Sequence, residues 1–491
     1  MALVPIRLPP GIYRAGTAYQ SKGRWHDGNL VRFIAGTIQP VGGWRSKAAL
    51  PSDPGKARAI LTWTANNSTA WTAIGTHARL FAMTRGGTVS DITPDGFTAG
   101  RADAQAAGGY GGGAYGEDEY GVPRPDTSQV QEASMWSLDS WGEKLIGVMA
   151  QDGIIYEWAL DPDEPAAAVE NAPSAAALLV TQEGILMALA AELNPRRVKW
   201  SDQRDNTVWT PDATNQAGDF DLQTNGRLLQ GLKVRGGNIL LTDLGAWLAS
   251  YTGDELVYRF DKLADGCGAV SRGAAIAIDA QAVWMGANNF WLYNGFVAPL
   301  PCEVWDHVFA DINRQQLSKV TCELSAAFGE VTWRYPSGGS LEIDRFVTWS
   351  FRENHWTIGS MARLCGIDAG VMQYPLRVDA AGAVHEHEVG YAYDGVMPFL
   401  EGGPLELGNG DSIAYAQALL PDDRTLGEVS ASFRIKFEPD GEETSFGPYT
   451  LARRTDLRFG GRQIKIRFDG VANAPWRIGE PRLELVTGGL R

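Results

Sequence analysis

The sequence predicts an all-β protein whose main part is a β-propeller of about six or seven blades. Two neighbouring stretches, 238–251 and 274–293, each hold a short apolar run, a polar corner and a second run rich in aromatic residues. Runs of four to six apolar residues are too short for helices, and corners such as Asp243-Leu-Gly carry the chemistry of hairpin turns. Each stretch therefore predicts two antiparallel strands.

Similar hairpins recur along the chain at a spacing that is typical of propeller blades. They lie at 71–83, 145–158, 178–188, 326–335 and 376–387. Including the first two stretches, the corners fall 31 to 77 residues apart, near Thr76, Gly153, Gly184, Gly245, Asn289, Gly329 and Gly382. A loose hairpin repeat of this length predicts a propeller.

Composition is compatible with a large soluble β protein. The 491 residues include 17 Trp and 58 Gly, which suit packed aromatic side chains and tight turns. No apolar run approaches the roughly 20 residues of a membrane helix, and the N-terminus lacks the apolar core of a signal peptide. Four cysteines are too far apart for a Cys-x-x-Cys pair, and we interpret them as buried thiols: Cys267, Cys302, Cys322 and Cys365.

We expect three parts in the chain. Residues 1–47 form an N-terminal arm and strand that packs on the platform or on a neighbour, because Pro9 and Pro10 favour an extended chain and Asn29–Ile34 alternates as a strand does. Residues 48–411 form the propeller, with a Gly/Tyr-rich loop inserted at 100–127 and a short helix at 304–313. Residues 412–491 form a C-terminal β-sandwich-like platform domain, since strands such as Val429–Phe437 alternate apolar with polar residues.

The net charge of −15 is unevenly distributed. Residues 1–47 carry +6, residues 48–425 carry −23 and residues 426–491 carry +2. An acidic body argues against binding of nucleic acid through bulk charge, since that binding depends on cations that neutralise phosphates. It suits a surface past which DNA slides, and it equally suits a large protein that must stay in solution.

Candidate chemistry is sparse. Carboxylates stand at predicted strand ends, namely Asp243, Asp279, Glu330 and Asp344. Glycoside hydrolysis needs two carboxylates that are paired in space, so this alternative stays open. Ser201–Trp209 resembles a sialidase blade turn, but its Asp is displaced and its Gly is missing.

A metal site is the other chemical alternative. His385 and His387 are two residues apart on one strand face and could bind Zn²⁺, but no third ligand is evident and an ordinary polar strand is favoured. The sequence has no phosphate-binding loop, no nucleophile elbow and no His-Glu-x-x-His motif. We therefore name no catalytic, cofactor-binding or metal-binding residue.

Several motifs resemble one family. These are Pro10–Trp25, Val198-Lys-Trp-Ser-Asp with Thr214–Asp219, Val283–Gly295, and Trp476–Leu483 with the last four residues, 488–491. They are similar to the tail nozzle, or hub, proteins of short-tailed bacteriophages, also called packaged-DNA stabilisation proteins or tail tubular protein B. The motifs span both ends and the middle of the chain, although the chain is much shorter than the longest members of the family.

The resemblance implies a structural virion protein without cofactor or catalysis. It implies a homo-hexameric ring below the portal and the head-to-tail adaptor ring, which retains packaged DNA and conducts it at ejection, with tail fibres or spikes as possible further partners. It places the chain in the virion tail, assembled in the host cytoplasm. The alternative is a tail propeller that binds or hydrolyses host glycans. We also expect that removal of residues 1–45 prevents ring formation or adaptor docking and leaves the propeller folded.

Overall fold

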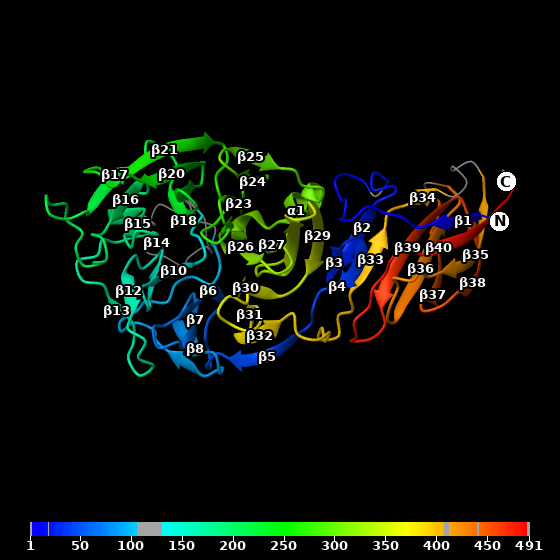
Figure 1. The fold of residues 1–491 in the computed structure, drawn as a ribbon, viewed down its shortest axis with the longest axis horizontal. Helices are drawn as coiled ribbons and strands as arrows, with labels where there is room; N and C mark the ends of the chain where they lie inside the picture. The colour runs from blue at the N-terminus through cyan, green and yellow to red at the C-terminus, as the bar shows by residue number, and fades with distance from the viewer. Residues whose placement is uncertain (1, 18, 106–129, 407–411, 439–440, 489–491) are drawn as a thin grey trace, which may run out of the picture.

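The protein is a closed seven-bladed β-propeller joined to a β-sandwich (Figure 1). The structure, a computed structural model, describes residues 2–17, 19–105, 130–406, 412–438 and 441–488. The predicted fold class is confirmed, and the blade count is seven. The Gly/Tyr-rich part of the predicted loop, 108–121, lies outside the described residues. No helix in the described ranges is long and apolar enough to cross a membrane.

Six blades consist of four consecutive antiparallel strands, of which the first faces the propeller axis. Blade 1 is β6 (Ala57–Thr64), β7 (Ala70–Thr76), β8 (Leu80–Thr84) and β9 (Val89–Asp91). Blade 2 is β10 (Trp136–Trp141), β11 (Lys144–Met149), β12 (Ile155–Trp158) and β13 (Ala167–Ala168). Blade 3 is β14 (Ala177–Val180), β15 (Leu186–Leu189), β16 (Arg197–Trp200) and β17 (Gly218–Asp221). Blade 4 is β18 (Leu228–Val234), β19 (Gly237–Thr242), β20 (Gly245–Tyr251) and β21 (Tyr258–Asp265). Blade 5 is β22 (Ala275–Ile278), β23 (Gln281–Met285), β24 (Phe290–Tyr293) and β25 (Val297–Leu300). Blade 6 is β26 (Thr321–Ser325), β27 (Glu330–Tyr335), β28 (Arg345–Ser350) and β29 (His355–Ser360).

The seventh blade closes the ring with a strand from the other end of the chain. It consists of β30 (Arg363–Ile367), β31 (Leu376–Asp379), β32 (Ala383–His387) and, outermost, β5 (Trp44–Ala49). β5 pairs antiparallel with β32, so that Trp44 lies opposite His387 and Ala49 opposite Ala383. Each of the seven predicted corners falls in a different blade, at the end of a strand or in the turn beside it.

Both chain ends build the sandwich. One sheet has the strand order β1 (Ala2–Pro5), β40 (Arg482–Thr487), β35 (Ala414–Leu420) and β38 (Thr455–Gly461). The other has the order β2 (Trp25–Asn29), β33 (Phe399–Gly402), β39 (Gln463–Gly470), β36 (Val429–Lys436) and β37 (Thr444–Thr450), and β34 (Leu405–Glu406) also pairs with β39. A hairpin of β3 (Val31–Ile34) and β4 (Thr37–Pro40) adjoins it.

The two units meet at boundaries that differ from the predicted ones. β5 spans the predicted boundary at residue 47 and belongs to the propeller, whereas β33 and β34 precede residue 412 and belong to the sandwich. The structural units are therefore 44–387 for the propeller, and 1–43 with 388–491 for the sandwich. The single strand predicted at 29–34 is interrupted at Leu30, where a left-handed backbone (φ 56°) separates β2 from β3.

The N-terminal arm lies on its own chain. The backbone N–H of Ile6 donates to Pro481 O at 2.8 Å in the sandwich, and that of Ile12 donates to Trp356 O at 2.7 Å in blade 6. One continuous apolar core joins the sandwich to blades 5 and 6. The predicted helix is confirmed as α1 (Trp305–Asp311), which follows blade 5, and two short 3₁₀ helices are η1 (Ala191–Leu193) and η2 (Arg314–Lys319).

Candidate functional site

The strand-end carboxylates are distributed over blades 4, 5 and 6, and each is bound to its own partner. Asp243 accepts hydrogen bonds from Arg227, and Asp279 accepts from Arg235. The other two are bound as well, Glu330 by Arg32 and Asp344 by the Ser337 hydroxyl and backbone N–H. Among the described residues, no hydrogen bond joins two of these four carboxylates. Each of the four carboxylates is therefore held by a cationic or polar group of its own.

The two histidines of β32 have separate roles. His385 Nε2 lies 2.9 Å from Asp379 Oδ2, whereas the buried His387 ring contacts Arg377 at 3.0 Å and Arg363 at 3.3 Å. In the part of the chain that the structure describes, no group of three or more His, Cys, Asp or Glu side chains could hold a metal ion. The two rings lie 6.4 Å apart and act as polar members of a strand.

The four cysteines are free thiols. Cys267 and Cys365 are buried, and Cys302 and Cys322 are partly covered. Burial raises the pKa of the Cys302 and Cys365 thiols to about 12. A thiol with such a pKa stays protonated at neutral pH and is a poor nucleophile or metal ligand.

Buried charges cluster at the face of the propeller where the innermost strands begin. Arg58, near the start of β6, donates to Glu342 at 2.6 and 2.9 Å and to the backbone oxygen of Ala102 at 2.6 Å. Lys319, which is fully buried just before β26, binds Glu342 at 3.1 Å and also binds Asp103. Burial alone would raise the pKa of Glu342, but Arg58 and Lys319 outweigh it and hold the pKa below its ordinary value. These residues form the first part of what we call the axial cluster.

The second part of the axial cluster centres on Glu132, four residues before β10. Arg272 donates to Glu132 at 3.0 Å and Arg227 donates to its other carboxylate oxygen. Burial would raise the pKa of Glu132, but these two guanidinium groups together hold it below its ordinary value. Arg227 and Arg272 precede β18 and β22, so one carboxylate connects three blades at the axis.

The axial cluster anchors the two segments that flank 106–129. Gln105 and Gln131 pair through their backbones, Ala104 exchanges two hydrogen bonds with the Gln316 side chain at 2.9 Å, and the Ala133 N–H donates to the Ser318 hydroxyl at 3.2 Å. The described ends of the predicted insertion are therefore fixed at the propeller axis. The sequence did not reveal this cluster, because its partners come from different blades and follow no local motif.

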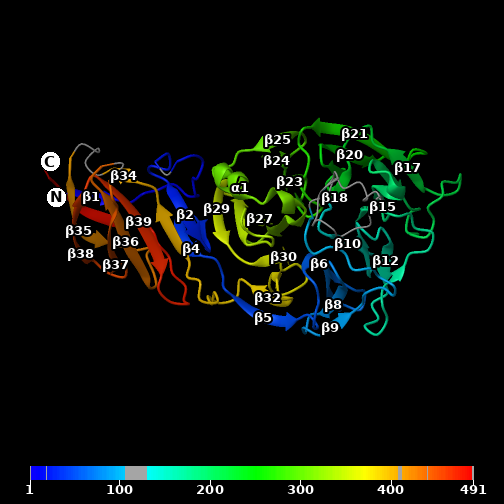
Figure 2. The same cartoon turned by 180° about the vertical axis from the view of Figure 1, so that it is seen from behind.

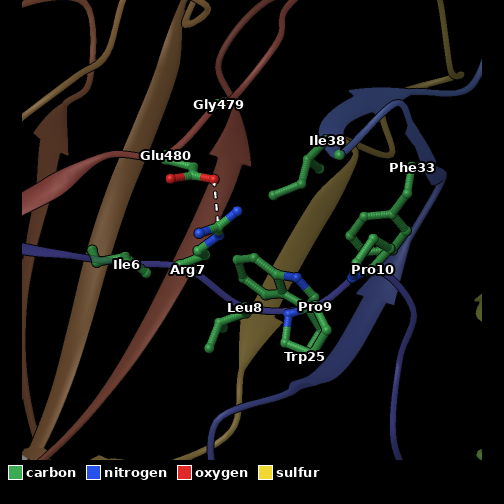
Figure 3. A pocket seen from close by; sticks show the side chains of 11 residues that line it. Ile6, Arg7, Leu8, Pro9, Pro10, Trp25, Phe33, Ile38, Gly479 and Glu480 are labelled. Carbon is green, nitrogen blue, oxygen red and sulfur yellow. Dashed lines mark ion pairs between the residues drawn. The ribbon is translucent and has the colours of Figure 1, made fainter.

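A cavity of about 390 Å³ lies where the arm crosses the sandwich (Figure 3). We call it the junction cavity, and its lining residues are Ile6, Arg7, Leu8, Pro9, Pro10, Trp25, Phe33, Gly36, Ile38, Gly479 and Glu480. Trp25 is 3% exposed, and its indole N–H finds no acceptor among the described residues. Arg7 pairs with Glu480 at 3.1 Å, with both side chains largely exposed. The cavity is therefore walled mainly by apolar side chains, with the Arg7–Glu480 pair in its lining.

Charge divides the molecule along its long axis. The sandwich residues 1–43 and 388–491 hold 17 Lys or Arg and 17 Asp or Glu, whereas residues 44–387 hold 26 against 41, so the propeller carries the whole net charge of −15. Blades 2 and 3, residues 136–221, hold five Lys or Arg against 15 Asp or Glu. These two blades form the end of the molecule that is farthest from the sandwich and from both termini (Figure 1).

The sequence matches no protein-family model and no curated protein. Solved structures with a similar architecture include virginiamycin B lyase from Staphylococcus aureus, at 9% identity and a TM-score of 0.41, over 69% of this chain and 97% of that one. They also include the Pan2 WD40 domain of Neurospora crassa, at 8% and 0.41 over 72% and 95% of the two chains. The exo-β-1,3-galactanase of Phanerochaete chrysosporium matches at 9% and 0.31 over 91% and 100%.

These structures correct one expectation. The sequence led us to expect a protein that is not an enzyme, and this is contradicted at the level of fold, because similar structures include a lyase and a galactanase. Likeness at these identities and TM-scores concerns the fold alone and assigns no activity to the chain. We therefore withdraw the expectation that the protein is not an enzyme, and we assign it no particular enzymatic activity.

Proposed function

We propose that the chain is a subunit of a hexameric nozzle ring in the tail of a short-tailed bacteriophage. The ring would sit below the portal and the head-to-tail adaptor, retain packaged DNA and conduct it at ejection. The observation that carries the proposal is the division of charge, with a neutral sandwich and a propeller of net charge −15. Phosphate backbones bind to cationic surfaces, so an acidic wall lets DNA pass without holding it.

The way in which the two units are joined supports a structural role in a particle. The arm binds the sandwich through Ile6 and blade 6 through Ile12, and Arg24 pairs with Glu303 after blade 5 at 2.6 Å. A continuous apolar core between two units resists their relative motion better than a flexible linker does. A ring that confines DNA requires subunits that do not bend at their internal junction.

The resemblance of the motifs supplies the biological context. Of the matching segments, Pro10–Trp25 lies in the N-terminal arm, Val198–Asp202 lies in blade 3 and Trp476–Leu483 lies in the sandwich. The proposed partners are five further copies of the chain, the adaptor ring and, at the far end, tail fibres or spikes. The proposed location is the virion tail.

Protection of packaged DNA tests the proposal. Particles assembled without this chain should lose their genome, so that DNase digests most of the DNA, and addition of the purified chain before release from the adaptor should restore nuclease resistance. The measured quantity is nuclease-resistant DNA per particle. Equal resistance with and without the chain would reject the retaining role.

A further inference from the structure

An asparagine that is followed by glycine can lose ammonia from its side chain without an enzyme. The backbone nitrogen of the glycine attacks the side-chain amide carbon, and glycine has no Cβ that would hinder the approach. The chain contains three such pairs, Asn225-Gly226, Asn294-Gly295 and Asn409-Gly410, of which the third lies outside the described residues. The two described pairs have opposite surroundings.

Asn294 and Gly295 lie in the turn between β24 and β25. Tyr293 lies opposite Val297 in the ladder, so the turn consists of residues 294–296, and all of them are exposed. Gly295 has a φ of 107°, and no atom beyond its two chain neighbours lies within 4 Å of the point where a Cβ would stand. Its backbone N–H donates no hydrogen bond to any described residue. The attacking nitrogen is therefore unbound, and the space around it is open.

Gly226 is held in place instead. Its backbone N–H donates to the Thr224 hydroxyl at 3.1 Å, and the backbone N–H of Arg227 donates to Asp243 at 2.9 Å. Gly226 is buried, and a Cβ there would lie 2.7 Å from Asp243 Oδ1. The Asn225 side chain is as exposed as that of the other asparagine, so side-chain exposure does not distinguish the two pairs. An attack by Gly226 would first have to break the hydrogen bond to Thr224.

The two pairs also lie at different distances from the propeller axis. β18, which begins shortly after Asn225, is an innermost strand, whereas β25 is the outermost strand of blade 5 (Figure 2). Among the described strands, β25 pairs with β24 alone. Local opening at the edge of a sheet costs less free energy than opening at the packed centre of a domain. The turn 294–296 can therefore change its backbone conformation while the rest of blade 5 stays in place.

We propose that Asn294 is a site of spontaneous deamidation in the folded protein and that Asn225 is protected. Gly295 N forms a bond to Asn294 Cγ, the bond from Cγ to Nδ2 breaks, and the amide group leaves as ammonia with the proton of the Gly295 N–H. Water then opens the cyclic imide at either carbonyl carbon, which gives aspartate or isoaspartate. Each event adds one negative charge to the turn. The inference goes beyond the proposed ring and does not depend on it.

Comparison of the folded with the unfolded chain separates the effect of structure from that of local sequence. The full-length chain is incubated in mildly alkaline buffer with and without urea and is then digested briefly at acid pH. Both asparagines are followed by peptide mass spectrometry and by labelling with an isoaspartate methyltransferase. In the folded chain, Asn294 should react at least about tenfold faster than Asn225, because a hydrogen bond and burial hold Gly226. In urea the difference should shrink to about threefold or less, since both pairs are then equally exposed.

Two variants supply matched controls. Asn294→Gln keeps an amide in the turn but requires a larger ring, so modification at this position should be lost. Thr224→Val is close to threonine in shape and removes the acceptor of the Gly226 N–H, so it should speed the reaction at Asn225 at least about threefold and leave Asn294 unchanged. Equal rates for the two asparagines in the folded chain, or reaction at Asn294 only in urea, would overturn the proposal. An unchanged rate at Asn225 in Thr224→Val would overturn the reason given for its protection.

Discussion

Arg32 connects three parts of the chain through one buried guanidinium. It lies in β3 and donates to both oxygens of Glu330 in blade 6, at 3.1 and 2.9 Å. It also donates to both oxygens of Glu388, just after β32, at 3.0 and 2.9 Å. Burial would raise the pKa of Glu388, but Arg32 outweighs it and keeps that pKa below its ordinary value. One cation therefore neutralises two carboxylates at the junction of propeller and sandwich.

Removal of this cation should weaken the whole chain. Arg32→Ala leaves two buried carboxylates without their partner, and we expect the free energy of unfolding to fall by about 3–5 kcal/mol. Arg235→Ala removes an ion pair with Asp279 in which both side chains are exposed, and should cost less than about 1 kcal/mol. Urea unfolding followed by tryptophan fluorescence measures both. Similar losses for the two variants would contradict the role given to Arg32.

His387 makes stability depend on pH. Burial, followed by the charges of Arg377 and Arg363, holds its pKa well below the ordinary value. In the unfolded chain the imidazole takes up a proton near pH 6.5, while in the folded chain it stays neutral. The free energy of unfolding should therefore be unaffected by this group above pH 6.5 and should fall below it, by about 2 kcal/mol between pH 6.5 and 5.

His387→Gln isolates that contribution. A glutamine oxygen can still accept a hydrogen bond from Arg377 but does not titrate. We expect the variant to lose less stability than the parent chain as the pH falls from 6.5 to 5, measured by urea unfolding at several pH values. An unchanged slope would show that His387 does not carry this dependence.

Single elements were predictable where their partner is close in sequence. Hairpins such as β19 and β20, and the helix α1, follow local patterns of apolar residues and turns, and all of them appear in the structure. The boundary predicted at residue 47 divides β5 instead. Its partner β32 lies at the other end of the propeller sequence, so no local pattern in residues 44–49 indicates the pairing. The break between β2 and β3 at Leu30 could not be predicted, because leucine rarely adopts a left-handed backbone and its presence does not indicate one.

The candidate sites were less predictable than the strands, because their residues also lie far apart in the sequence. The axial cluster unites Lys319 with Asp103 and Arg272 with Glu132, pairs that meet only because the blades form a ring. The junction cavity arises where the arm crosses the sandwich, and no motif marks Trp25 as a donor without an acceptor. The charge division was visible in the sequence, although its boundaries needed the structural units.

Because β5 closes blade 7, removal of the N-terminal residues should affect the propeller. Removal of residues 1–45 was expected to spare the propeller, but it takes Trp44 and Arg45 from β5 together with the arm that covers blade 6. Removal of residues 1–49 should leave β32 without its neighbour and increase hydrogen exchange throughout blade 7. Removal of residues 1–5 eliminates only β1 at a sandwich edge and should leave blade 7 protected. Hydrogen exchange of the two truncated chains is compared by mass spectrometry. Equal protection of blade 7 in both chains would contradict closure of the propeller by β5.

At the scale of the whole molecule, the chain has an acidic end, a neutral end and a rigid junction between them. The end with blades 2 and 3 holds most of the excess negative charge, and the sandwich holds none. In the proposed ring, the acidic surface of the propeller would be the one that faces DNA. The proposed retention of DNA therefore requires a closed assembly of copies.

The most direct test is the mass and symmetry of the purified particle, with and without its adaptor ring, by light scattering and class averages from negative stain. The nozzle account predicts a six-fold ring with an axial hole, formed by the chain alone or on the adaptor. A strictly monomeric propeller under both conditions would contradict it.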